Sequence, residues 1–239
     1  MLYGGGLKSI ICVIRKFLRF LWETNITESD YSTAIPQSIP QRRKVYSGFS
    51  ETEITMILDE IDQNTTVGKR DYAIIMIATK TGLRAVDIVN LKFENIDWRT
   101  KEIRIIQRKT GNPLSLPLEP DVGNAIASYI LHARPDSESQ VIFGYIKSGK
   151  KLKAKSLVAL VGRLVSRCGL SNTRIRCGIH SFRRGFGKGL LESNVSIDMI
   201  SELLGHTDIN SSKPYIAIDE AGLKCCSLSL AGIAEVSKC

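Results

Sequence analysis

Six residues spread along the chain have side chains that could act together on a phosphate ester. They are two arginines, two histidines, a lysine and a tyrosine: Arg84, Lys109, His180, Arg183, His206 and Tyr215. Guanidinium groups bind phosphate oxygens as a planar fork, while imidazole and ammonium groups can accept or release a proton. A tyrosine can attack phosphorus when a neighbouring group takes its proton. If the fold brings these residues together, they predict phosphoryl transfer with tyrosine as the nucleophile.

Each residue taken alone also has an ordinary structural interpretation. Arg84 stands at the start of a helix, and Asp87, three residues on, could hold its guanidinium in a structural ion pair. Lys109 lies at the tip of a hairpin, where a lysine is usually only solvated. His180 and Arg183 are three residues apart and share a helix face, but neither satisfies the other. This second pair is better suited to gripping one phosphate.

The stretch LLGHTDINSSKPYI supplies the last two candidates. Gly205 is expected to end a helix, His206 stands at its exit, and Tyr215 follows nine residues later. A surface tyrosine is the alternative. The candidate set contains no acidic pair that could bind Mg²⁺, so we expect neither a metal nor a cofactor, with the cations stabilising the charge instead.

The charge distribution indicates an acidic partner. The formal net charge is +9 and the isoelectric point is about 9.3. Between Glu138 and Glu192 there is no acidic residue but there are twelve lysines and arginines. Contact with many phosphates requires such a tract, which favours nucleic acid over a membrane surface or an acidic protein. Unpaired cysteines and the lack of a secretory signal lead us to expect a cytoplasmic, nucleoid-associated protein.

Periodicity predicts a mostly helical domain with one small β-hairpin sheet. The predicted helices cover residues 9–23, 50–62, 68–80, 119–133, 155–168, 181–193 and 196–204, and the strands cover 102–107 and 114–118. Ser50 and Glu53 form a predicted capping box. Residues 29–44 read as an extended linker, so residues 1–45 look like the end of one unit plus a tether.

The order and contexts of the candidate residues resemble the tyrosine recombinases, also called phage integrase-type site-specific recombinases. The blocks that carry this resemblance are TGLRAVDI, RKTG followed by LPL, HSFR, LLGH and YI, between about residues 45 and 218. The resemblance implies a mainly α (α+β) fold, with a helical catalytic domain of the DNA breaking-rejoining type and a small antiparallel β-sheet. Residues 1–45 would be the remnant of a core-binding (SAM-like) domain plus linker, and residues 46–239 the catalytic domain with a C-terminal tail.

The resemblance also implies a reaction: site-specific cleavage and rejoining of double-stranded DNA through a 3′-phosphotyrosyl link, in integration or excision. Tyr215 would be the nucleophile, and Arg84 and Arg183 would bind the scissile phosphate. His180 would accept the tyrosine proton, and Lys109 would protonate the departing 5′ oxygen. A class IB-type topoisomerase and a catalytically idle DNA-binding remnant of an integrase remain the alternatives.

Further implications concern the surroundings of this chemistry. His206 would hydrogen-bond the phosphate, and Asp87 would orient Arg84 from behind. The weakly amphipathic tail 219–239 would dock on a neighbouring protomer of a homotetramer on DNA, whereas a helix closing its own core is the alternative. The chain departs from the family in two respects. Arg184 stands where the family commonly has histidine, and most of the core-binding domain is missing, as expected for a truncated copy, a fragment or a remnant.

Overall fold

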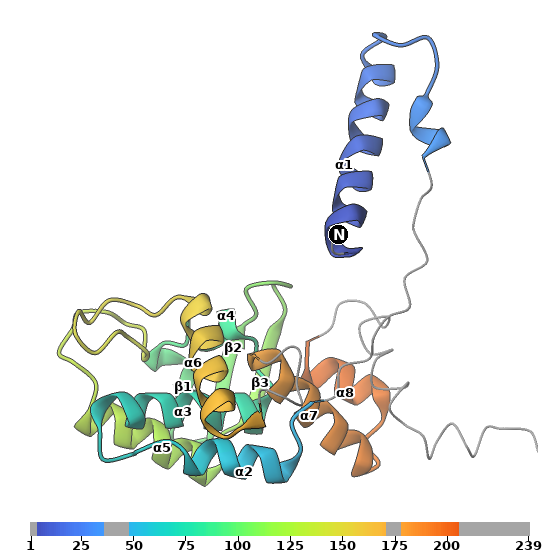
Figure 1. Ribbon diagram of the computed structural model, residues 1–239. Helices are drawn as coiled ribbons and strands as arrows, with labels where there is room; N and C mark the ends of the chain where they lie inside the picture. The colour runs from blue at the N-terminus through green and yellow to red at the C-terminus, as the bar shows by residue number, and fades with distance from the viewer. Residues whose placement is uncertain (1–3, 36–47, 171–177, 206–239) are drawn as a thin grey trace, which may run out of the picture. The chain divides into compact units, whose positions relative to one another are not determined.

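The computed structural model describes residues 4–35, 48–170 and 178–205, and the chain divides into two units, Met1–Lys44 and Val45–Cys239 (Figure 1). Each unit is therefore described by itself. The predicted positions of His206, Tyr215 and the tail 219–239 lie outside the described residues.

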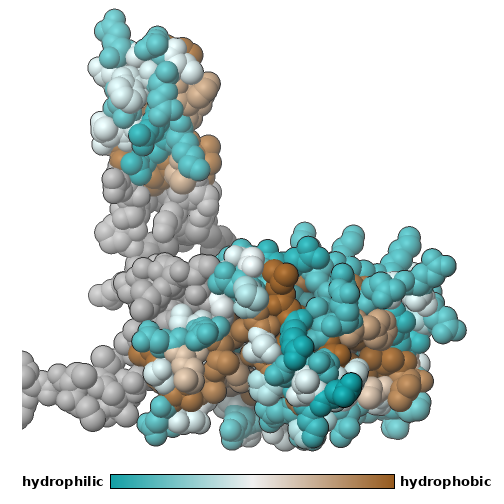
Figure 2. All heavy atoms as spheres, turned by 180° about the vertical axis from the view of Figure 1, so that it is seen from behind, coloured by the Kyte–Doolittle hydropathy of each residue, from teal (hydrophilic) through white to brown (hydrophobic). Residues whose placement is uncertain are grey.

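The N-terminal unit consists of one long helix and one short turn of helix. Helix α1 (Gly4–Glu23) begins earlier than predicted and packs on the 3₁₀ helix η1 (Tyr31–Ala34). Asp30 caps η1, since its Oδ1 accepts a hydrogen bond from the Ser32 amide at 2.9 Å. The prediction of an extended linker is thus wrong at residues 31–34. Helix α1 has apolar and hydrophilic sides (Figure 2), and its exposed apolar residues are Ile10, Val13, Ile14, Phe17, Phe20 and Trp22.

The second unit opens with the predicted capping box. Helix α2 (Glu51–Asp59) begins after Ser50, whose Oγ accepts from the Glu53 amide at 3.3 Å. The Glu53 carboxylate accepts in return from the Ser50 amide at 2.8 Å. The two bonds satisfy helix-end donors that would otherwise have no partner within the helix.

Helix α3 (Thr66–Thr81) is the centre of the core. It packs against α2, α5 and α7 and carries a run of six buried residues, Ala73, Ile74, Ile75, Met76, Ile77 and Ala78. A helix that is apolar over most of its circumference must be covered on most sides. It ends as predicted at Gly82, whose left-handed backbone (φ 61°) allows the chain to turn sharply towards Arg84.

A three-stranded antiparallel sheet lies beside this core in the order β1-β2-β3. Strands β2 (Glu102–Ile106) and β3 (Pro113–Pro117) are the predicted hairpin, with Ile103 opposite Leu116. The short strand β1 (Ile96–Asp97) was not predicted, because two residues give no periodic signal. Alternate residues of β2 are buried, so the inward face continues from Ile103 and Ile105 to the first residue of the hairpin loop, Gln107.

The remaining helices start and end within two residues of their predicted bounds: α5 (Pro120–His132), α6 (Ala154–Arg167), α7 (Ile179–Glu192) and α8 (Ile197–Leu203). The helix expected to start at Arg84 is the short α4 (Ala85–Ile88), and one short segment was missed, η2 (Phe93–Asn95). The predicted fold class, mainly helical with a small antiparallel sheet, is confirmed. Among the described residues, no helix is both long and apolar enough to cross a bilayer.

Candidate active site

Arg84 is held at the junction between α3 and α4. It is the N-cap of α4 with extended backbone angles and is only 9% exposed. Its Nη1 donates to Gln107 Oε1 at 2.6 Å, and its Nη2 donates to the Gly205 carbonyl at 3.1 Å. Three sequence segments far apart in the chain therefore meet at this guanidinium.

Arg183 reaches the same place from α7. It is 4% exposed, and its Nη1 donates to the Gly82 carbonyl at 2.9 Å. Its Nη2 donates to the Leu204 carbonyl at the end of α8. The last carbonyls of a helix lack partners within the helix and lie at its negative end, so they are suitable acceptors for a cation. The structure thus brings the two predicted arginines together around the C-terminal end of α8.

Asp87 does not hold the Arg84 guanidinium as expected. Its Oδ1 accepts from the backbone amide of Arg108 at 2.9 Å, which ties α4 to the hairpin loop. Its Oδ2 is buried and has no hydrogen-bond partner among the described residues. No ion pair joins Arg84 to Asp87 among those residues, because Asp87 faces the hairpin backbone while Gln107 occupies the position beside Arg84.

Gln107 is the residue that the sequence interpretation missed. It is 1% exposed and contacts Arg84, Thr110 and the end of α8. One signal could have found it. A glutamine at an inward position of an alternating strand is a buried polar group, and such a group needs partners.

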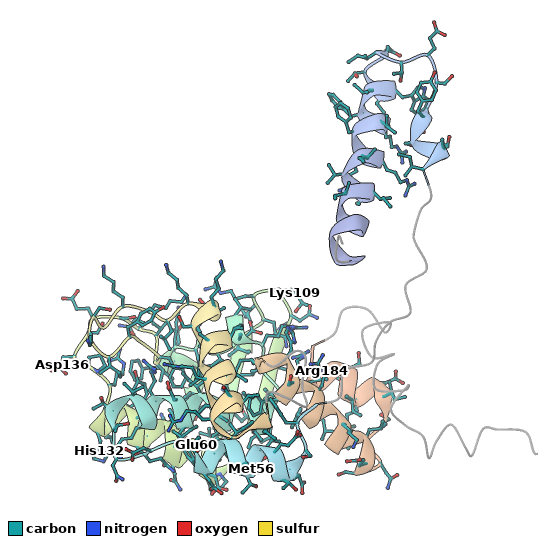
Figure 3. The ribbon with its side chains drawn as sticks, viewed as in Figure 1. Met56, Glu60, Lys109, His132, Asp136 and Arg184 are labelled. Carbon is teal, nitrogen blue, oxygen red and sulfur yellow. The ribbon has the colours of Figure 1, made fainter. Side chains whose placement is uncertain are left out.

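Lys109 lies in the loop of the β2–β3 hairpin and is exposed. Figure 3 shows its side chain at the upper edge of the second unit, away from the labelled Met56 and Glu60. Two backbone hydrogen bonds close the loop. The Gln107 backbone N–H donates to the Asn112 carbonyl at 2.9 Å, and the Gly111 backbone N–H donates to the Gln107 carbonyl at 2.8 Å. The lysine is therefore carried by a defined turn beside Gln107.

His180 lies in the first turn of α7, one turn before Arg183, and is exposed. Its pKa is lowered from the usual 6.5, first because surrounding atoms exclude part of the solvent and then because positive charges lie nearby. Those charges belong to Arg183, Arg184, Arg84 and Lys109. The imidazole is consequently neutral at neutral pH and can accept a proton.

In the described part of the chain, three of the other candidates, Arg84, Lys109 and Arg183, thus lie within electrostatic reach of His180. His206 and Tyr215 follow Gly205 in sequence and lie outside the described residues. Within residues 4–35, 48–170 and 178–205, no three histidine, cysteine or acidic side chains gather as metal ligands would.

Five exposed lysines of the second unit lie in the segment that follows α5 and in the first turn of α6. They are Lys147, Lys150, Lys151, Lys153 and Lys155. None of them forms an ion pair with another described residue. By contrast, Lys80, Lys92 and Lys188 pair with Glu119, Glu94 and Glu192 at 3.1, 2.9 and 3.0 Å. We call this group the lysine cluster.

A family model described as the phage integrase family matches residues 48–221. The chain belongs to the phage integrase family. One relative, the putative integrase/recombinase y4rA of Sinorhizobium fredii, is 30% identical over 237 residues, which cover 95% of this chain and 56% of that protein. Another, the putative integrase/recombinase y4gC of the same organism, is 36% identical over 173 residues, which cover 72% of this chain and 88% of that protein. This phage integrase family chain therefore spans little more than half the length of y4rA.

Solved structures share the fold of this family member. A crystal structure of XerA recombinase superposes with a TM-score of 0.63 at 18% identity, covering 88% of this chain and 71% of that one. The structure of a lambda integrase dimer bound to a COC′ core site gives 0.69 at 17% identity, covering 88% and 72%. The post-cleavage complex of XerH with difH gives 0.68 at 22%, covering 80% and 55%.

Proposed function

We propose that this chain is a site-specific recombinase that cuts and rejoins DNA through a covalent tyrosyl intermediate, in the integration or excision of a DNA element. One observation carries the proposal. Two buried guanidinium groups meet at one helix end, beside a histidine kept neutral by its surroundings and a lysine on a turn. The relatives described as integrases and recombinases support the same activity.

In the proposed reaction, the Tyr215 hydroxyl attacks the scissile phosphorus. A bond forms between the tyrosine oxygen and phosphorus, and the bond to the 5′ oxygen breaks. His180 takes the tyrosine proton, for which its lowered pKa suits it, and Lys109 gives a proton to the departing oxygen. Attack by a 5′ hydroxyl from a partner strand reverses these steps and rejoins the DNA without an external energy source.

The arginines act on the charge of the phosphate. Arg84 uses one N–H of each Nη atom on protein acceptors, and a guanidinium has five N–H donors in total. Three donors of Arg84 therefore have no partner among the described residues and are available to non-bridging phosphate oxygens. Arg183 binds the same phosphate, and His206 adds a hydrogen bond. Removing one such charged donor typically costs about 10²–10³-fold in rate.

Double-stranded DNA is the proposed partner. The lysine cluster supports this assignment, because exposed cations without acidic partners remain available to phosphates. Two solved structures with the same fold are DNA complexes, of XerH with difH and of lambda integrase with a core site. We assign residues 1–45 to the end of a core-binding domain, which the division of the chain at Lys44 supports. Since two duplexes exchange four strands, each cut by one tyrosine, a homotetramer on DNA is proposed.

The test is covalent trapping on a nicked duplex that carries the site flanking the gene. The wild-type chain should form a denaturation-resistant adduct in the presence of EDTA, and Tyr215→Phe should fold and bind the duplex but form none. An adduct that persists in Tyr215→Phe would place the nucleophile elsewhere. The first alternative would be Tyr145, whose hydroxyl shares a hydrogen bond with Ser156 Oγ at 2.6 Å.

Two further assays separate the alternatives. A substrate with two sites should yield recombinants, whereas relaxation of supercoiled DNA without recombinants would indicate a topoisomerase. Binding without any adduct would indicate a remnant that no longer catalyses the reaction.

A further inference from the structure

Gln107 occupies the point where the hairpin loop, α4 and α8 meet, although it belongs to none of the predicted catalytic groups. Its backbone closes the loop that carries Lys109 through hydrogen bonds of 2.9 Å to Asn112 and 2.8 Å from Gly111. Its buried side chain then turns inward, away from solvent. The backbone of Gln107 thus fixes the hairpin loop, while its side chain bonds to Arg84 and to the end of α8, so that the loop and these groups are held together.

The amide of Gln107 is oriented without ambiguity by its partners. Its Oε1 accepts from Arg84 Nη1 at 2.6 Å and from Thr110 Oγ1 at 2.9 Å, while its Nε2 donates to the Leu204 carbonyl at 3.2 Å. A guanidinium can only donate and a carbonyl can only accept, so the oxygen must face Arg84. Only a primary amide of this length supplies an acceptor and a donor in these two directions. Glutamate lacks the donor and leucine lacks both.

The end of α8 is shaped to receive this amide. Gly205 has a left-handed backbone (φ 59°), and a Cβ built there would lie 2.3 Å from both Nε2 and Oε1 of Gln107. Only glycine therefore allows the amide to approach the helix end this closely. The Leu204 carbonyl accepts from both Gln107 and Arg183, so the amide also joins the two arginines through a shared acceptor.

We propose that Gln107 is a positioning residue, which fixes the Arg84 guanidinium and the Lys109 turn against the end of α8 so that both face one phosphate. This inference rests on the proposed strand-cleavage function. Gln107 itself would not touch DNA. Without it, Arg84 would keep its charge and its bond to Gly205 but lose the bond on Nη1, and its fork would no longer be fixed.

The experiment compares Gln107→Leu with Ser115→Ala, a matched control at an exposed position of the same hairpin. Adduct formation is measured on a nicked duplex as a function of DNA concentration. We expect Gln107→Leu to lower the rate at saturating DNA by about 10-fold or more, with duplex affinity changed less than about 2-fold, because orientation acts on the chemical step. Ser115→Ala should match the wild type.

A second substrate distinguishes positioning from loss of structure. In a methylphosphonate, a methyl group replaces one non-bridging oxygen and removes its negative charge, so the reaction depends less on correctly placed guanidinium groups. On this substrate, the rate of adduct formation by Gln107→Leu should be less than about 3-fold below that of the wild type. An equal deficit on both substrates would show that Gln107 only supports the fold, and no deficit on the phosphate substrate would also overturn the inference.

The hydrogen bond itself is tested without catalysis. The free energies of unfolding of Gln107→Leu, Arg84→Met and the double variant should be non-additive, because the side chains share a buried hydrogen bond. Additive values would overturn the inference even if the wild type forms adducts. If the values are non-additive but the wild type forms no adduct on either substrate, the proposed strand cleavage fails, and the catalytic part of this inference fails with it.

Discussion

An alanine at Gly205 should disturb the arginine cluster, Arg84 and Arg183 at the end of α8, without altering either arginine. The residue follows α8 with φ 59°, and the added Cβ would lie 2.3 Å from two atoms of the Gln107 amide. Gly169 provides a matched control. It follows α6 in the same way with φ 71°, but no described atom lies within 4 Å of its added Cβ.

Both substitutions should lower the free energy of unfolding through backbone strain, but only Gly205→Ala should lower it further through a steric clash. A non-glycine residue in the left-handed region costs about 1–2 kcal/mol at either position. At Gly205 the amide must also move, which separates it from Arg84, Thr110 or Leu204 and leaves buried groups without partners, at about 1–3 kcal/mol more. The free energy of unfolding should therefore fall by about 2–5 kcal/mol in Gly205→Ala and by about 1–2 kcal/mol in Gly169→Ala.

Urea unfolding of the two purified variants measures this difference directly. In a domain of this size, the extra 1–3 kcal/mol corresponds to a melting temperature lower by about 2–12 °C. Gly205→Ala should also slow adduct formation, whereas Gly169→Ala should not. Equal losses of stability in the two variants would refute the close approach of Gln107 to the helix end.

Three further predictions concern charge. Replacing Lys150, Lys153 or Lys155 by alanine should weaken duplex binding. The slope of log affinity against log salt concentration should fall by about 1 for each phosphate that the variant no longer neutralises. Lys80→Ala is the control and should leave the slope unchanged, because the Lys80 side chain pairs with Glu119. A slope that is unaffected in all three variants would contradict the assignment of the lysine cluster to DNA binding. The folded-state pKa of His180 lies below 6.5, so the adduct rate at pH 6.5 should be more than half of its maximum, and a rate at or below half there would contradict the assignment. The lowered pKa of His180 also affects folding, because the unfolded chain binds the proton more tightly than the folded one. The contribution of His180 to the free energy of unfolding is therefore present above pH 6.5 and is lost as the pH falls below 6.5.

The sequence predicts those parts of the fold that depend on local interactions. Ser50 and Glu53 are three residues apart and cap the same helix end, so their pairing needs no tertiary information. The turn at Gly82 follows from its lack of a side chain in the same local sense. The hairpin of β2 and β3 was equally visible, because alternation and turn residues coincide there.

The errors arose where tertiary contacts decide. Spacing along a helix placed Asp87 beside Arg84, but α4 is only four residues long and turns that carboxylate to the backbone of Arg108. Gln107 is 23 residues from Arg84 in sequence and could not be paired with it by any local rule. Short elements such as β1 were missed because two residues have no periodicity.

The arginine cluster shows why only part of such a site can be predicted from a sequence. A buried guanidinium needs hydrogen-bond acceptors, and a carboxylate would supply them while cancelling the charge. In this fold, Arg84 donates instead to an amide oxygen and a backbone carbonyl, and Arg183 donates to the carbonyls of Gly82 and Leu204. The acceptors of Arg84 are neutral dipoles, so they hold its side chain in place without cancelling its positive charge. Backbone carbonyls have no residue type, and the sequence therefore reveals the cations but not the groups that orient them.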